Sequence, residues 1–130
     1  MKLARALLWL SAGVFVAVGS GFLLVPREWA ALTDISVPTA MARTDLRATY
    51  GGFSLGFGLY LAACARRATG LRPGLVALAL CAAGFALGRL LGIVAEGGAS
   101  PLMQLYFGID ALVTLLALLA LRRLPATGTP

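Results

Sequence analysis

Two ionisable residues, Arg89 and Asp110, lie inside the long apolar stretches GFALGRLLGIV and LYFGIDALVTLL. A charge near the middle of a bilayer costs roughly 2.5–3.5 kcal/mol on insertion scales, so such residues usually face a helix bundle interior and find partners. Arg89 precedes Glu96 by seven residues and Asp110 follows Pro101 by nine, which places both roughly 10–14 Å below the same end of their helices. Because a short turn joins the two stretches, we expect the two side chains to meet.

The segment RTDLRATYGG, residues 43–52, is expected to bring further polar groups to this place. If Thr44 caps a helix, Asp45 lies in the first turn, where the helix dipole favours an anion. Arg47 is then about 5 Å into the helix, and Tyr50 lies on the same face three residues later. The stretch that contains Asp110 adds Tyr106, one turn before the acid. We therefore predict one polar cluster near the outer face, made of Arg47, Tyr50, Arg89, Glu96, Tyr106 and Asp110.

Four members of this cluster also have a plainer interpretation. Arg89 and Asp110 can be a structural ion pair that fixes the register of two helices. Glu96 can be a solvated turn residue, and Tyr106 can be an aromatic anchor at the membrane interface. The alternatives to a pure ion pair are a ligand-facing role or a role in proton handling.

The elements that position these residues are apolar helices. The chain has 130 residues, of which 60% are hydrophobic and only 12% charged, and its mean hydropathy is +0.92. Lipid offers no partner for backbone polar groups, so runs of about 20 apolar residues must be helical to cross it. We predict an all-α integral membrane protein, a four-transmembrane-helix antiparallel bundle. Its single domain, residues 1–130, contains helices at about 6–25, 46–65, 73–95 and 101–121, an outer loop at 26–43 and a flexible tail at 124–130.

The orientation follows from the basic residues. Three segments carry basic residues with no acid among them: the N-terminus, the connection between the second and third runs, and the C-terminus. Their basic residues are Lys2, Arg5, Arg66, Arg67, Arg72, Arg122 and Arg123. The other side mixes arginines with acids. The positive-inside rule therefore predicts a multi-pass membrane protein with both termini in the cytoplasm.

Two segments have competing interpretations. The N-terminal charges and ALLWLSAGVFVAV resemble a secretory signal peptide, but the apolar stretch continues through Val25 to spanning length, so we expect it to remain. Within the outer loop, REWAALTDI can form a short interfacial helix. An irregular loop is the preferred interpretation, and a lid over the polar cluster is the alternative.

Small residues four apart predict close helix packing. They are Gly52 and Gly56 in the second run, and Gly84, Gly88 and Gly92 in the third. In lipid, such faces let two backbones approach. We expect them to pack within the bundle, with a homodimer or a membrane-protein partner as the alternative.

Several classes of function have no support in the residues. There is no histidine, which excludes His-based metal sites and His-ligated haem. Cys64 and Cys81 form no CxxC motif and are expected at different depths, so we predict no disulfide and no paired-thiol redox centre. The net charge of +6 flanks apolar runs, a pattern typical of lipid contact and not of nucleic-acid binding. No P-loop or nucleophile motif is present, so we expect no enzyme, no metal and no obligate cofactor.

Three motifs carry a family resemblance: DLRATYGG at the head of the second run, GRLLGIVAEGG closing the third, and a lone acid in the fourth. Over residues 5–122 the chain resembles a family of short bacterial four-span membrane proteins known only as a domain of unknown function, similar in layout to DoxX-like proteins. That family carries a glutamate in the last span, where this sequence has Asp110. The resemblance implies this fold in the bacterial inner membrane, and no established reaction. DoxX-like relatives include quinone-linked redox accessories.

Three functions follow as hypotheses. The first is a polar pocket in the outer leaflet that binds a small amphipathic ligand, a lipid or a quinone, or a membrane partner. The second is an accessory subunit of a quinone-linked redox system. The third is a small proton-coupled exporter, which the absence of any charge between Arg5 and Arg27 disfavours.

Overall fold

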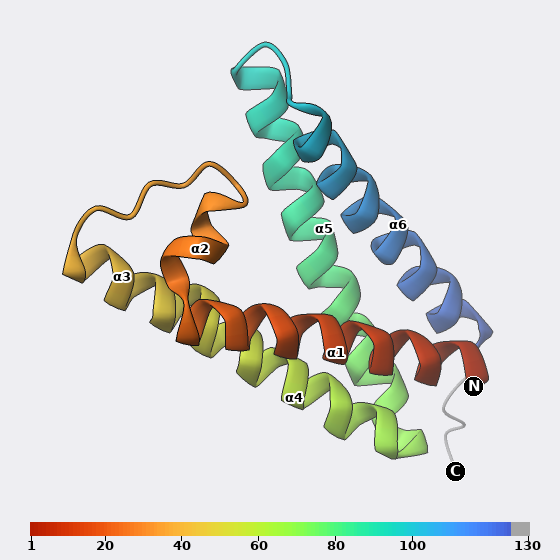
Figure 1. The fold of residues 1–130 in the computed structure, drawn as a ribbon. Helices are drawn as coiled ribbons and strands as arrows, with labels where there is room; N and C mark the ends of the chain where they lie inside the picture. The colour runs from red at the N-terminus through yellow and green to blue at the C-terminus, as the bar shows by residue number, and fades with distance from the viewer. Residues whose placement is uncertain (126–130) are drawn as a thin grey trace. The chain divides into compact units, whose positions relative to one another are not determined.

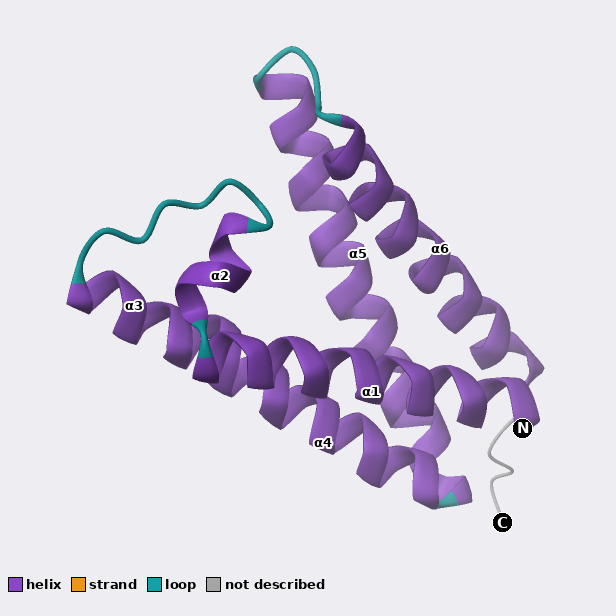
Figure 2. Cartoon of the chain, in the orientation of Figure 1, coloured by secondary structure: helices purple, strands orange, loops and turns teal. Residues whose placement is uncertain are grey.

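The chain folds into helices joined by short connections. The computed structural model describes residues 1–125, and every regular element in this part is helical (Figure 2). The all-α prediction is therefore confirmed. In chain order the elements are α1 (Lys2–Leu24), α2 (Pro26–Ala31), α3 (Ala40–Leu46), η1 (Arg47–Gly52), α4 (Phe53–Arg66), η2 (Ala68–Gly70), α5 (Leu71–Ala95) and α6 (Pro101–Arg123).

Three helical segments of the described chain are long and apolar enough to cross a membrane. They are α1, the segment Ala68–Ala95 that contains α5, and α6. Four such helices were predicted. The difference lies in the second predicted span, 46–65, because its backbone is divided among α3, η1 and α4, and α4 alone has only 14 residues.

The helix that contains RTDLRATYGG begins earlier than predicted. Thr39, and not Thr44, is the N-cap: its backbone is extended and its hydroxyl accepts a hydrogen bond from the Ala42 N–H. The Thr44 hydroxyl instead donates to the Ala40 carbonyl. Asp45 therefore lies in the second turn of the helix, and the expected interaction with the first-turn N–H groups is wrong.

A π-helical segment, η1, interrupts this helix at RATYGG. At its end the Phe53 N–H donates to the Ala48 carbonyl, five residues earlier. Such π-helical turns inside α-helices are rare and occur frequently at functional sites. The wider turn changes the helical phase between the residues before it and those after it.

The described chain divides into two compact units. The hairpin unit comprises Met1–Leu8 and the chain from Cys64 onward, and the N-terminal unit comprises Trp9–Ala63.

The centre of the hairpin unit is the antiparallel pair α5 and α6, which lie side by side (Figure 1). Their connection turns at Gly97, whose φ of +71° is a conformation that glycine adopts readily. Ser100 then caps α6 by accepting from the Met103 N–H, and Pro101 occupies the first helical position, where a missing N–H does no harm. These three residues start α6 where the sequence predicts.

Both cysteines lie in the hairpin unit as free thiols, Cys64 buried and Cys81 partly buried. Near the other end of α6, the Pro125 carbonyl accepts a hydrogen bond from Arg72. The flexible tail was predicted at 124–130, of which residues 126–130 lie outside the described residues.

In the N-terminal unit, α1 packs closely against η1 and α4 through glycines. A Cβ on Gly58 would lie 2.9 Å from the Val16 backbone nitrogen, and one on Gly51 would lie 2.9 Å from the Leu23 side chain. By contrast, a Cβ on Gly56 would meet nothing within 4 Å in this unit. Gly51 and Gly58 thus make the close approach to α1 in this unit, and the packing predicted for Gly52 and Gly56 stays a prediction.

The predicted outer loop, 26–43, is partly helical. Its first residues form α2, and its last residues belong to α3. Ala30 and Val37 are buried against Phe22 of α1, with the Trp29 indole packed against the same cluster. The expectation of an irregular loop is therefore wrong for Pro26–Ala31, where Pro26 at the first position starts the helix.

The outer surface of the hairpin unit is strongly apolar. On α6 only Ala117 and Ala120 are buried, while large side chains such as Leu105 and Leu112 are more than half exposed. A contiguous apolar surface of this kind indicates contact with lipid or with another protein. The lengths and compositions of the three helices agree with lipid.

Candidate polar site on α5 and α6

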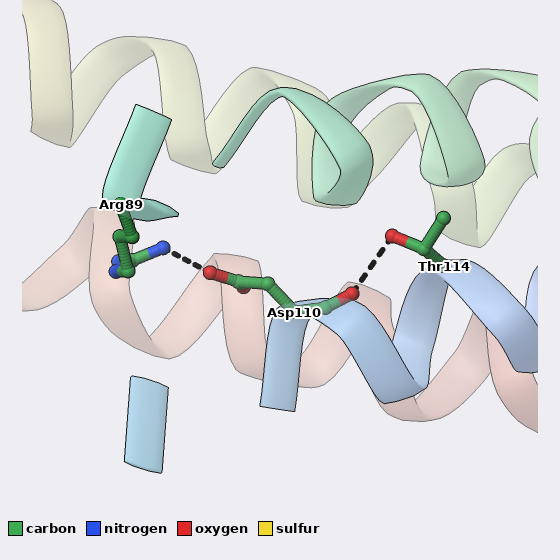
Figure 3. Close-up of polar contacts among 3 residues, drawn as sticks. All are labelled: Arg89, Asp110 and Thr114. Carbon is green, nitrogen blue, oxygen red and sulfur yellow. Dashed lines mark hydrogen bonds and ion pairs between the residues drawn. The ribbon is translucent and has the colours of Figure 1, made fainter. Parts of the chain in front are cut away.

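Arg89 of α5 and Asp110 of α6 form an ion pair. Arg89 Nη1 donates a hydrogen bond to Asp110 Oδ2 (Figure 3). The side chains are 28% and 18% exposed, respectively, so the pair is largely shielded by the two helices. The sequence predicts this meeting because the two residues lie at similar distances from the turn that joins their helices.

Two aromatic rings from the hairpin unit flank the guanidinium. Its central carbon lies 5.5 Å from the centroid of the Phe85 ring and 5.6 Å from that of the Tyr106 ring. Cation–π contacts of this kind contribute about 0.5–1 kcal/mol at exposed sites and more when desolvated. Tyr106 was predicted as a member of the cluster, and it lies beside Arg89.

Thr114 lies one turn beyond Asp110 but does not face the ion pair. Its hydroxyl donates to the Asp110 backbone carbonyl at 2.8 Å (Figure 3). The local hydrogen bond satisfies the hydroxyl within α6. Thr114 therefore adds no free polar group to the site.

A groove of about 450 Å³ runs from Arg89 toward the α5–α6 turn. Its lining residues are Gly88, Arg89, Gly92, Ile93, Glu96, Gly98, Ala99, Ser100 and Met103. A Cβ atom added to Gly88 or Gly92 would meet no other atom of this unit within 4 Å, so the backbone of α5 is uncovered there. The groove is therefore apolar along most of its length, with one cation and one anion on its lining.

Arg89 keeps hydrogen-bonding capacity toward this groove. Among the described residues its only hydrogen-bond partner is Asp110, which engages Nη1. A guanidinium has five N–H donors, so donors on Nε and Nη2 remain available to an acceptor in the groove. Within the hairpin unit, Asp110 and Tyr106 contact Arg89, whereas Glu96 shares only the groove lining with it.

The other two predicted members, Arg47 and Tyr50, lie in the N-terminal unit. Arg47 Nε donates to the Leu23 carbonyl at 3.0 Å. The Tyr50 ring packs on Phe22, with 5.1 Å between ring centroids. Their participation in a cluster with Arg89 stays a prediction.

Sequence reasoning missed Phe85 and the groove-lining residues of the turn. Phe85 lies one turn before Arg89, and this i, i+4 spacing was the available signal. The glycines were interpreted only as helix-packing residues. Nothing in the pattern of Gly88 and Gly92 distinguishes a packed face from an open groove.

A family model covers almost the whole chain. Residues 3–121 match the family described as a domain of unknown function, DUF4345. The chain belongs to this family. For this DUF4345 chain no match was found among curated proteins or among solved structures. The DUF4345 assignment agrees with the resemblance to an uncharacterised family, and it supplies no reaction.

Proposed function

We propose that this DUF4345 chain is a non-enzymatic, four-span protein of the bacterial inner membrane that binds a small amphipathic molecule, a lipid or a quinone, in the α5–α6 groove. One observation carries the proposal: Arg89, already neutralised by Asp110, also lines an open apolar groove. A purely structural ion pair needs no such groove beside it.

The charges favour a neutral polar head. Arg89 is balanced by Asp110, and Glu96 adds a further acid to the groove. An anionic head would meet no excess positive charge here, whereas a carbonyl of a quinone or an ester can accept a hydrogen bond from the guanidinium without adding charge. An apolar tail then lies along Gly88 and Gly92, where no side chain occupies the floor.

A fourth span is supported by the continuous helical backbone from Ala40 to Arg66. Its last 20 residues, 47–66, carry charges only at the two ends, Arg47 and Arg66. That length suits the ~30 Å hydrocarbon thickness of a bilayer. At the end of the π-helical segment the Phe53 N–H pairs with the Ala48 carbonyl, as the backbone of a span in lipid requires.

The test is the identity of molecules that stay with the full-length protein during extraction in polymer-bounded native discs. We expect mass spectrometry to find an enriched lipid or quinone with the wild type, and at least about tenfold less with Arg89→Ala, because a hydrogen bond to a charged donor contributes about 1.5–3 kcal/mol. The matched control is Arg122→Ala, in the last turn of α6. Equal retention by wild type and Arg89→Ala contradicts the proposal.

The same preparation separates the alternatives. A quinone-linked redox enzyme that co-purifies with the chain favours an accessory subunit similar to DoxX-like proteins. A proton-coupled exporter instead dissipates a pH gradient in proteoliposomes on addition of substrate, and Asp110→Asn abolishes this. Neither result is expected from a binding protein alone.

A further inference from the structure

A second pocket lies at the C-terminal end of α1, within the N-terminal unit. It has a volume of about 280 Å³. Its lining residues are Leu24, Val25, Pro26, Arg27, Glu28, Arg43 and Arg47. None of them belongs to the α5–α6 groove, so this is a separate site.

The pocket carries an excess of positive charge. Arg27, Arg43 and Arg47 contribute three cations and Glu28 one anion, which gives a formal net charge of +2. Among the described residues none of these four side chains forms an ion pair. Like charges one helical turn apart, such as Arg43 and Arg47, destabilise a helix, and a bound anion removes that cost.

Backbone carbonyls hold two of the arginines in place. Arg47 Nε donates to the Leu23 carbonyl at 3.0 Å, and Arg43 Nη1 donates to the Pro38 carbonyl at 3.4 Å. These bonds leave both terminal nitrogens of Arg47 and one of Arg43 without a protein partner among the described residues. Planar guanidinium groups held in this way suit bidentate binding of phosphate oxygens.

We infer that this pocket binds a phosphate group, and specifically a phosphomonoester or inorganic phosphate. Such groups carry a charge of about −1.5 to −2 at pH 7, which matches the net charge of the pocket, whereas a phosphodiester carries about −1. The pocket lies where the apolar helix α1 ends, the level at which headgroups lie in a bilayer. The phosphate can therefore come from a lipid headgroup or from solution. This inference is independent of the ligand proposed for the groove.

The test measures binding to the full-length protein in zwitterionic detergent. Inorganic phosphate is titrated by equilibrium dialysis, and phosphatidic acid and phosphatidylglycerol are compared by native mass spectrometry. We expect Arg27→Gln and Arg43→Gln each to weaken binding at least about tenfold, since a charge-assisted hydrogen bond is lost. Arg122→Gln, outside the pocket, is the charge-matched control.

A variant with tighter phosphate binding controls for the possibility that the arginine variants lose binding because they misfold. Glu28→Gln raises the net charge of the pocket to +3 and is expected to tighten phosphate binding several-fold, a result that misfolding cannot produce. Binding of phosphatidic acid alone identifies a lipid headgroup as the source, and binding of inorganic phosphate, with or without the lipid, identifies phosphate in solution as a ligand.

Four results overturn the inference. They are no binding of either probe, unchanged binding in both arginine variants, equal binding of phosphatidylglycerol and phosphatidic acid, and no tightening in Glu28→Gln.

Discussion

Replacing Asp110 with asparagine is expected to destabilise the α5–α6 pair by about 2 kcal/mol. The change keeps the size of the side chain and removes the charge that balances Arg89. Among the described residues no other acid forms an ion pair with Arg89, so the guanidinium is left as an unbalanced charge between two apolar helices.

The magnitude follows from the surroundings of the pair. Removing one partner of a fully buried ion pair costs about 3–5 kcal/mol. Here the side chains are 28% and 18% exposed, and the cation–π contacts to Phe85 and Tyr106 remain in the variant. Both features lower the loss below that range. The double variant Arg89→Gln/Asp110→Asn removes both charges and is expected to lose less than about 1 kcal/mol.

The assay is equilibrium unfolding in mixed micelles with increasing dodecyl sulfate, followed by far-ultraviolet ellipticity. Tryptophan fluorescence is unsuitable because Trp9 and Trp29 both lie in the N-terminal unit. Glu96→Gln is the control, since Glu96 forms no ion pair in the described part of the chain. A double variant that loses the sum of the two single losses would refute the coupling between Arg89 and Asp110.

Two further predictions concern packing and topology. Gly58→Ala should be less stable than Gly56→Ala by about 1–3 kcal/mol in the same unfolding assay. Both substitutions raise helix propensity, but only the Cβ at residue 58 meets the backbone of α1. Equal stabilities would contradict the close packing of α1 and α4. In a cysteine-free background, Ser36→Cys and Gly98→Cys should react with a membrane-impermeant maleimide applied to intact cells, whereas Thr69→Cys should react only after permeabilisation. Labelling of residues 36 and 98 from opposite sides of the membrane would contradict four spans.

The sequence predicts the regular helices of this fold well because their signals are local. Long, mostly apolar runs mark α1, α5 and α6, and the turn before α6 is marked by glycines and Pro101. The predicted runs overlap the observed helices with differences of a few residues at the ends. Helix ends depend on caps that several residues can supply, and Thr39 caps where Thr44 was expected.

The second predicted span, 46–65, contains a feature that the local sequence pattern does not predict, the π-helical segment. The sequence pattern predicts a regular α-helix at RATYGG, and the structure has a π-helical segment there. Within this segment Gly51 lies close to Leu23 of α1, a contact that the local pattern does not contain. The face predicted for Arg47 and Tyr50 assumed regular α-helical spacing, and their place in the polar cluster stays a prediction.

The polar sites were also predictable from the sequence only in part. The Arg89–Asp110 pair was predictable, because two charges in apolar helices joined by a short turn have few other partners. The basic pocket was not predicted, although Arg43 and Arg47 are four residues apart. Its third arginine, Arg27, joins them only because α2 turns back after α1, a tertiary event that spacing does not show.

The most direct test of ligand binding in the α5–α6 groove is to fill the groove with a substituted side chain and to measure whether the protein still retains its native ligand. Gly92→Leu places a side chain on the groove floor, where a Cβ meets nothing in its unit, and leaves Arg89 and Asp110 unchanged. Gly84→Leu makes the same change on the same helix outside the groove lining. We predict that mass spectrometry finds the lipid or quinone in wild type and Gly84→Leu and not in Gly92→Leu. Equal retention by all three proteins would contradict ligand binding in this groove.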